Sequence, residues 1–164
     1  MAVFSLTSAT VLVGAAWTGT APGTSATPSG TITSTTDLSS MLIQVQVSMS
    51  SAELASTNFA SGGWEEKISG LANGSIALTF NQDFAASKVD ALFGIGGTFG
   101  FAPGQVTPYY LDVKPTSSSR AATNPSYLAA FLNMGGDVIN GSVGDIATVT
   151  YTFPFTGRFH RLTS

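Results

Sequence analysis

The chain has 164 residues, which is the size of one domain with a substantial core. Charged residues make up only 9% of it, against roughly 25% in an average soluble domain, and the formal net charge is −3. The absence of cysteine excludes disulfides and thiolate metal sites, and six scattered Lys and Arg residues do not form the basic patch of a nucleic-acid-binding protein.

The first residues are apolar, but they predict strands. Residues 2 to 14 alternate between apolar and polar side chains, which places Val11 and Val13 on one face. Polar residues interrupt this run well before the 18 or so apolar residues that a membrane span needs. The first basic residue is Lys67, so the positive segment of a secretory signal is missing and we expect neither export nor a membrane location.

Two connections are long for a compact domain. Residues 15 to 36 are rich in Gly, Pro, Ser and Thr and predict a low-complexity loop that is either mobile or ordered against another subunit. Residues 50 to 64 predict a second long connection, which ends in two glycines and a tryptophan. Between them, residues 41 to 49 alternate cleanly and predict a strand with one face toward a core.

A hairpin and a helix are expected in the middle of the chain. Asn73-Gly74 lies between two extended runs, and both residues accept the positive φ values of a two-residue hairpin turn. A helix is expected from Asp83, as its N-cap, to Phe93, with Gly94 ending it. A helix of this length is not stable alone, so we expect its apolar stripe to cover a sheet.

The second half of the chain reads as a glycine-rich connection followed by strands. The strands are expected at residues 109 to 115, 126 to 133, 145 to 153 and 157 to 162. With no internal repeat, we expect one mainly β domain over residues 1 to 164. It would be a β-sandwich or partly closed barrel of about eight or nine strands with one short flanking α-helix.

Groups that could carry out catalysis are scarce. His160 lies between Arg158 and Arg161 with no second ligand at metal-binding spacing, and we expect it to be a half-exposed strand residue. Glu65 and Glu66 are adjacent in an extended run, so they point to opposite faces and do not share a site. The glycine-rich run after the helix lacks the Lys of a phosphate-binding loop. We therefore expect no enzyme, cofactor or metal.

The thinly charged surface indicates either interaction sites or a chain kept in solution by Ser, Thr and Gly. Both tryptophans fall in the long connections, where each is either part of a small local core or an anchor inserted into another chain. The candidate assembly-interface residues are Trp17, Phe59, Gly62, Gly63 and Trp64.

An ordered series of short motifs over residues 37 to 164 resembles the major tail protein, or tail tube protein, of long-tailed phages. The series runs GGW, a GL hairpin, DFAAS, KPTS, NPSY, VGD and a final TG before a short strand. No single motif is diagnostic. Residues 15 to 36 and the segment from Gly94 to Pro108 are longer than that pattern leads us to expect.

The resemblance implies a structural virion protein without enzymatic activity. Six copies would form a ring, and rings would stack into a tail tube that conducts DNA without binding it specifically. The inner sheets of neighbours would join edge to edge, and the connection from Ser50 to Trp64 would reach an adjacent subunit or ring. Other partners would be the tape measure, tail terminator and tail tip proteins, with assembly in the host cytoplasm and a final location in the virion tail.

Two other functions fit the same composition. One is a secreted or surface-displayed β-sandwich that binds carbohydrate or protein, with Trp17 and Trp64 stacking on sugar rings. The other is a different virion β-protein, such as a decoration or head-joining protein.

Overall fold

The computed structural model describes residues 8–24, 26–57, 62, 64–136 and 140–164. In these residues it has the strands and the helix β1 (Thr10–Trp17), β2 (Ile32–Asp37), β3 (Leu42–Ala55), β4 (Lys67–Asn81), α1 (Val89–Phe93), β5 (Tyr109–Lys114), β6 (Ser126–Phe131), β7 (Thr148–Pro154) and β8 (His160–Leu162). The mainly β prediction with one short helix is confirmed.

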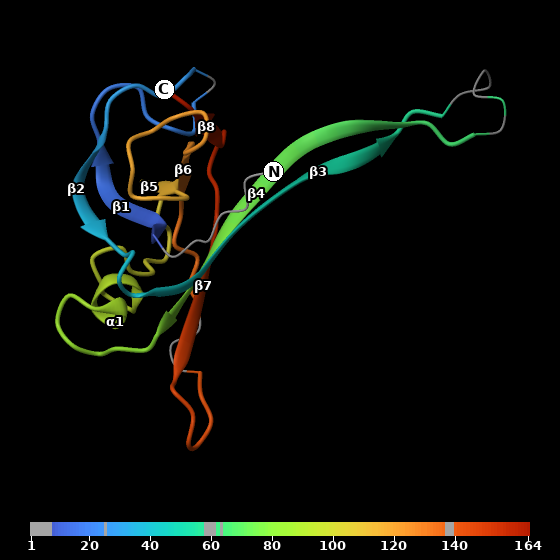
Figure 1. Cartoon of the computed structure of the whole chain (residues 1–164). Coiled ribbons are helices and arrows are strands. Elements are labelled where there is room, and N and C mark those ends of the chain that lie inside the picture. Colours follow the sequence, from blue (N-terminus) through green and yellow to red (C-terminus); the bar gives the residue numbers. More distant parts are fainter. Residues whose placement is uncertain (1–7, 25, 58–61, 63, 137–139) are drawn as a thin grey trace.

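The strands form two antiparallel sheets that pack face to face (Figure 1). The five-stranded sheet has the order β2-β1-β5-β6-β8, and the three-stranded sheet has the order β3-β4-β7. Each has two edge strands in the described part of the chain, so the fold is an open sandwich and not a closed barrel. Pro154 lies on the edge strand β7, where a missing amide donor is tolerated.

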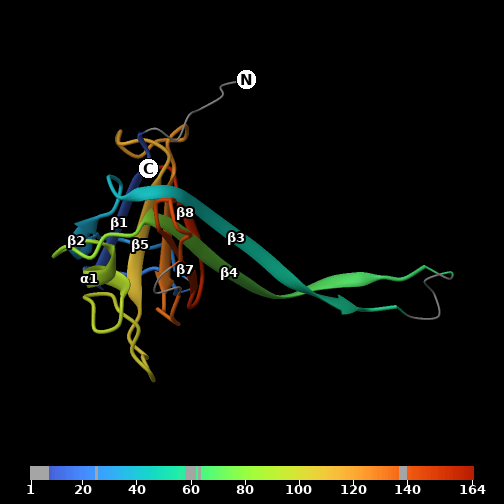
Figure 2. The same cartoon turned by 90° about the horizontal axis from the view of Figure 1, so that it is seen from below.

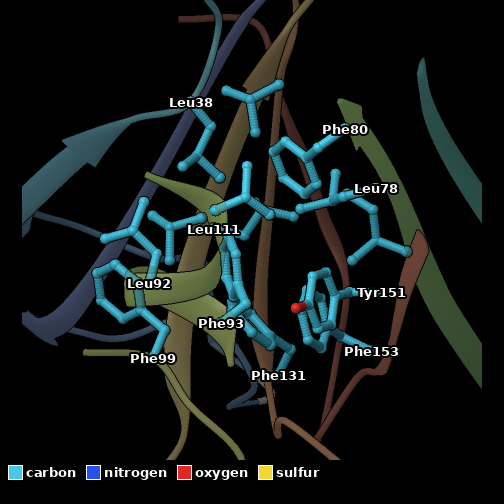
Figure 3. Packing of buried hydrophobic residues seen from close by; sticks show 14 of the residues in the cluster. Leu38, Leu78, Phe80, Leu92, Phe93, Phe99, Leu111, Phe131, Tyr151 and Phe153 are labelled. Atoms are coloured by element: carbon cyan, nitrogen blue, oxygen red, sulfur yellow. The ribbon is translucent and has the colours of Figure 1, made fainter. Parts of the chain in front are cut away.

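Helix α1 contributes to the core from one end of the sandwich. Its buried residues are Val89, Leu92 and Phe93. The ring of Phe93 lies 5.4 Å from the rings of both Tyr151 and Phe153, so it fills the space beside the three-stranded sheet (Figure 3). The expected role of the helix, to cover a sheet with its apolar stripe, is therefore confirmed.

The helix begins later than the sequence predicts. Its N-cap is Lys88, with no capping bond from the side chain, and the Asp83 carboxylate instead accepts the amide of Ala85 at 2.9 Å. Ser87 between them has a positive φ of 62°, a left-handed conformation that no α-helix contains. Asp83 thus stabilises a separate turn, and the helical part is confined to Val89–Phe93.

A buried asparagine fixes the end of the helix. Asn133 is 1% exposed, and its side-chain amide donates to the carbonyls of Phe93 and Phe99 at 3.3 and 2.7 Å. Its Oδ1 accepts the amide of Gly135 at 2.9 Å. These bonds satisfy the carbonyl of Phe93 at the end of the helix and that of Phe99 in the following loop, and they hold this loop against the end of β6.

Residues 15 to 36 do not form one continuous loop as predicted, because strands occupy both ends of this range. Trp17 is the last residue of β1, and β2 begins at Ile32. The residues between them fold back over the five-stranded sheet of their own chain, where Pro22 and Pro28 are buried. The segment is therefore ordered within the subunit.

His160 is buried by the same segment and is not half-exposed as predicted. Its side chain is 7% exposed, and Nε2 lies 3.3 Å from the carbonyl of Thr24. The neighbouring backbone is also paired, because the amide of Arg158 donates to the carbonyl of Gly23 at 3.2 Å. These contacts could not be predicted from local sequence, because they join residues more than 130 positions apart.

The predicted hairpin turn at Asn73-Gly74 is wrong. Strand β4 runs through both residues, where Asn73 pairs with Ser50 and Gly74 pairs with Met49. Glycine is needed here for close packing, since a Cβ on Gly74 would lie 2.7 Å from the ring of Phe155. β3 likewise continues to Ala55, through part of the predicted connection at residues 50 to 64.

The first prediction concerns the core. Phe93→Ala should lower the free energy of unfolding by about 3–5 kcal/mol, because it leaves a cavity among four aromatic rings. Phe84→Ala, at a side chain that is 62% exposed, should change it by about 0.5 kcal/mol or less. Chemical denaturation measures both, and equal losses would contradict the packing described for Phe93.

Candidate assembly interface

The β3–β4 hairpin extends far beyond the sandwich. We call its projecting part, which the structure describes at residues 48–57, 62 and 64–74, the arm. Figures 1 and 2 show it leaving the body as a two-stranded ribbon in both views. Every residue of β3 from Gln46 to Ala55 is exposed, so neither face of the arm is covered by the described remainder of the chain.

Backbone pairing is the main interaction that holds the arm together. The ladder continues to Leu54↔Ile68 and Ala55↔Lys67, with an irregularity between Ser51 and Glu53. An ion pair joins Lys67 Nζ to Glu53 Oε2 at 2.7 Å, but the side chains are 49% and 72% exposed, so the pair contributes little to stability. A two-stranded ribbon with both faces in water is marginally stable by itself.

The arm also carries large apolar side chains that have no cover. The most exposed are Leu71 at 88%, Trp64 at 80% and Met49 at 61%. The whole chain exposes 9,700 Å², whereas a compact monomer of 16.8 kDa exposes about 7,700 Å². The excess of about 2,000 Å² exceeds the roughly 800 Å² that one partner buries in a standard interface. This extra surface is polar and apolar together, and the exposed apolar side chains of the arm contribute to it.

The interface residues predicted from the sequence lie in different places. Trp64 and Gly62 belong to the end of the arm, and Gly62 has a positive φ of 61°. Trp17 is half-buried, donates from Nε1 to the carbonyl of Ser29 at 2.9 Å, and lies 5.8 Å from the ring of Tyr110. Phe59 and Gly63 lie outside the described residues. Trp17 thus has partners within its own subunit, whereas Trp64 does not bury its side chain there.

The face of the three-stranded sheet that points away from the core is uncharged. Its cross-strand rows run Gln44–Thr79–Thr150 and Gln46–Ala77–Thr152. The hydroxyls of Thr79 and Thr150 lie 2.9 Å apart. The alternate residues of these strands are the apolar core residues, so this polar face follows directly from the period of two. These two rows carry amides, hydroxyls and the methyl group of Ala77, and no charged group.

Further exposed apolar side chains lie in the connections after α1 and before β7. They are Ile95 at 83% and Val106 at 87%, which follow α1, and Val143 at 108% and Ile146 at 75%, which precede β7. β4 ends beside the start of β7, with Asn81 paired to Thr148. We call these two connections the helix end, because the first of them follows α1 (Figure 1).

No cluster of three potential metal ligands occurs in the described part of the chain. Within the same part, no helix has the length and hydropathy to cross a membrane.

The half-buried carboxylate of Asp112 was not anticipated from the sequence. Asp112 lies on the outer face of the five-stranded sheet and accepts a short hydrogen bond from Ser126 Oγ. Burial raises the pKa of Asp112 above its ordinary value of 3.8, although the bond from Ser126 and the charges of Arg120 and Lys114 act in the opposite direction. The guanidinium of Arg120 also donates to the carbonyl of Ser164 at 3.3 Å, which holds the chain's last residue in place.

Three solved structures are similar to this one. A chain in the hybrid structure of the SPP1 tail tube matches 99% of this chain and 80% of its own length, with a TM-score of 0.57 and 9% identity. A chain in the tail of the empty gene transfer agent particle, refined with C6 symmetry, matches 76% of this chain and 83% of its own, with a TM-score of 0.53 and 18% identity.

The third is a chain in the virion of the native gene transfer agent particle. It matches 74% of this chain and 84% of its own, with a TM-score of 0.51 and 17% identity. The chain has the tail-tube fold. The sequence matches neither a family model nor a curated protein. The similarity to the tail-tube structures is therefore one of fold and not of sequence. This fold is the one that the sequence resemblance implies.

The second prediction concerns Asp112. Because its pKa is raised in the folded state, the native chain binds more protons than the unfolded chain just above pH 3.8, so stability should fall as the pH rises through that range. Asp112→Asn keeps an oxygen that accepts from Ser126 but does not titrate. The variant should therefore gain stability relative to the original chain as the pH rises from 3 to 7, measured by denaturant unfolding. Parallel pH profiles would contradict the raised pKa.

Proposed function

We propose that this chain is the structural subunit of a tail tube, in which copies form rings and the rings stack into a hollow conduit for DNA. The observation that carries the proposal is the arm, a long ribbon whose two faces and apolar side chains have no cover in the described part of the chain. The tail-tube fold supports it, since one of the similar chains comes from a tail with C6 symmetry.

Edge strands give such a subunit further surfaces for joining copies. β3 and β7 are the edges of the three-stranded sheet, and β2 and β8 are those of the other. An exposed edge pairs readily with another strand, so a ring in which neighbouring sheets join would satisfy its open backbone groups. The helix end offers apolar area for contact between successive rings.

The uncharged face of the three-stranded sheet suits the wall of a DNA conduit. Lys and Arg on such a wall would bind phosphates and retain the DNA, and the two cross-strand rows of this face contain only amides, hydroxyls and a methyl group. The subunit's net charge of −3 gives six times −3, or −18, for a ring of six copies. We propose that this face lines the bore.

The carbohydrate-binding alternative has less support. Sugar binding would use the two tryptophans as stacking platforms, but Trp17 packs on Tyr110 within the five-stranded sheet, whereas Trp64 lies near the end of the arm. They do not form one platform. A decoration protein remains the second candidate, because an exposed arm would also serve a protein that attaches to a capsid.

Assembly is the direct test of this function. The purified chain should form rings or tubes as its concentration rises, seen by negative-stain electron microscopy. Trp64→Ala should reduce assembly by at least about tenfold while leaving the unfolding midpoint unchanged, because the side chain is exposed in the subunit but would be an interface anchor. Trp64→Phe, which keeps an aromatic anchor, should assemble. A monomer at all concentrations, or loss of folding in Trp64→Ala, would contradict the proposal.

The bore assignment has its own test. Gln46→Lys adds a positive charge to the uncharged face, and Thr27→Lys adds one to an exposed position on the segment that covers the other sheet. Both variants should form tubes of normal length. Particles with Gln46→Lys tails should release DNA more slowly, and added salt should restore the rate because it weakens phosphate contacts. Equal DNA release from the two variants would place the uncharged face outside the bore.

A further inference from the structure

A groove lies where the arm leaves the body. Its apolar walls are Val47 and Met49 of β3, Val113 of β5, and the side chains of Tyr127 and Phe159. The rings of Tyr127 and Phe159 stack at 5.8 Å with 14° between their planes, which makes one wall flat and aromatic. The groove has a volume of about 450 Å³, within the range of sites that bury a drug-sized group. We call it the root groove.

The root groove is an unfilled continuation of the sandwich core. Val47 pairs with the buried Ile76, so it belongs to the core-facing side of the three-stranded sheet. The next residue on that side of β3, Met49, lies beyond the body and is 61% exposed, and Val47 is 37% exposed. Apolar side chains of the two sheets thus face a space that no described residue of the chain fills.

The charges at the root groove and at the end of the arm are opposite in sign. Lys114 lines the root groove, and Arg158 lines an adjoining hollow that shares Met49 and Phe159 with it. At the end of the arm, Glu65 and Glu66 are exposed beside Trp64. The other charged pair of the arm, Glu53 and Lys67, is neutral as a unit. An apolar groove with a basic rim therefore complements an exposed tryptophan followed by two carboxylates.

The arm does not fill the root groove of its own subunit. The β3–β4 ladder runs from Met49↔Gly74 to Ala55↔Lys67 without turning back, and it carries the end of the arm away from the body (Figure 2). The eight residues from Ser48 to Ala55 span about 27 Å at the usual rise of a strand. That distance is enough to reach an adjacent subunit, since a compact domain of this length has a radius of gyration of about 15 Å.

We infer that the root groove is the socket for the arm of a second copy of this chain, with Trp64 in the groove and the two carboxylates facing Lys114 and Arg158. The inference rests on the proposed function and specifies which surface receives the arm. The contact is heterologous, because each subunit gives its arm to one neighbour and receives the arm of another. Repetition of such a contact produces a ring when the rotation closes and a filament when it does not.

Cysteine cross-linking tests the socket. The sequence contains no cysteine, so only the introduced thiols react. One population carries Glu65→Cys, which retains Trp64, and a second population of different mass carries Met49→Cys in the root groove. The matched control carries Ile95→Cys at the helix end, where the side chain is 83% exposed. The populations are mixed under assembly conditions and treated with a short bismaleimide.

The 65–49 mixture should give at least about tenfold more cross-linked heterodimer than the 65–95 mixture, because docking raises the effective concentration of the two thiols. Adding Trp64→Ala to the Glu65→Cys chain should abolish the difference, and Trp64→Phe should retain it. If rings form but the 65–95 mixture cross-links as well as or better than the 65–49 mixture, the socket is overturned while the proposed tail-tube function still stands. Failure of every mixture to assemble would overturn both the socket and the proposed function.

Discussion

The pairing of β3 with β4 is the interaction on which the rest of the structure depends. Where it crosses the body, it places Ile76, Leu78 and Phe80 in the core, all fully buried. The same ladder then continues beyond the body, where no described residue covers its apolar side chains. A two-stranded ribbon in water is marginally stable, so the arm would gain stability from a molecule that covered it.

The body of the molecule supports that arm with a dense aromatic core. Phe93 from α1 reaches Phe80 of β4, and Tyr151 and Phe153 of β7, at centroid distances of 5.4 to 5.7 Å. The short helix thus stabilises the strand from which the arm extends. The segment between β1 and β2 covers the other sheet. The chain therefore buries most of its own apolar faces despite its low charge, and the exposed apolar side chains described above lie at the arm, the root groove and the helix end.

The sequence predicted much of this fold because strand alternation is a local signal. The strand predicted at residues 145 to 153 largely coincides with β7, and the predicted end of the helix at Phe93 is the observed one. The arm was not recognised, because Asn73-Gly74 has the local signature of a turn. Its real role depends on Phe155, which is 81 positions away from Gly74 and becomes its neighbour only when β7 pairs with β4.

The cover over the five-stranded sheet escaped prediction for a similar reason. Its Ser, Thr, Gly and Pro residues give no periodicity, and the partners of the segment, such as His160, come from the other end of the chain. For the candidate interface, the sequence indicated that Trp64 stands in an exposed connection. It gave no sign of the root groove, because the groove is built by β3, β5 and the region around β8 together.

The central claim is that the arm lacks cover in the subunit and gains it from neighbouring copies. Hydrogen–deuterium exchange, measured by mass spectrometry on the dilute monomer and on assembled material, tests it most directly. The account predicts that peptides from residues 48–57 and 64–74 exchange rapidly in the monomer and slowly after assembly, while peptides from β5 stay protected in both. Arm peptides that exchange at the same rate before and after assembly would contradict it.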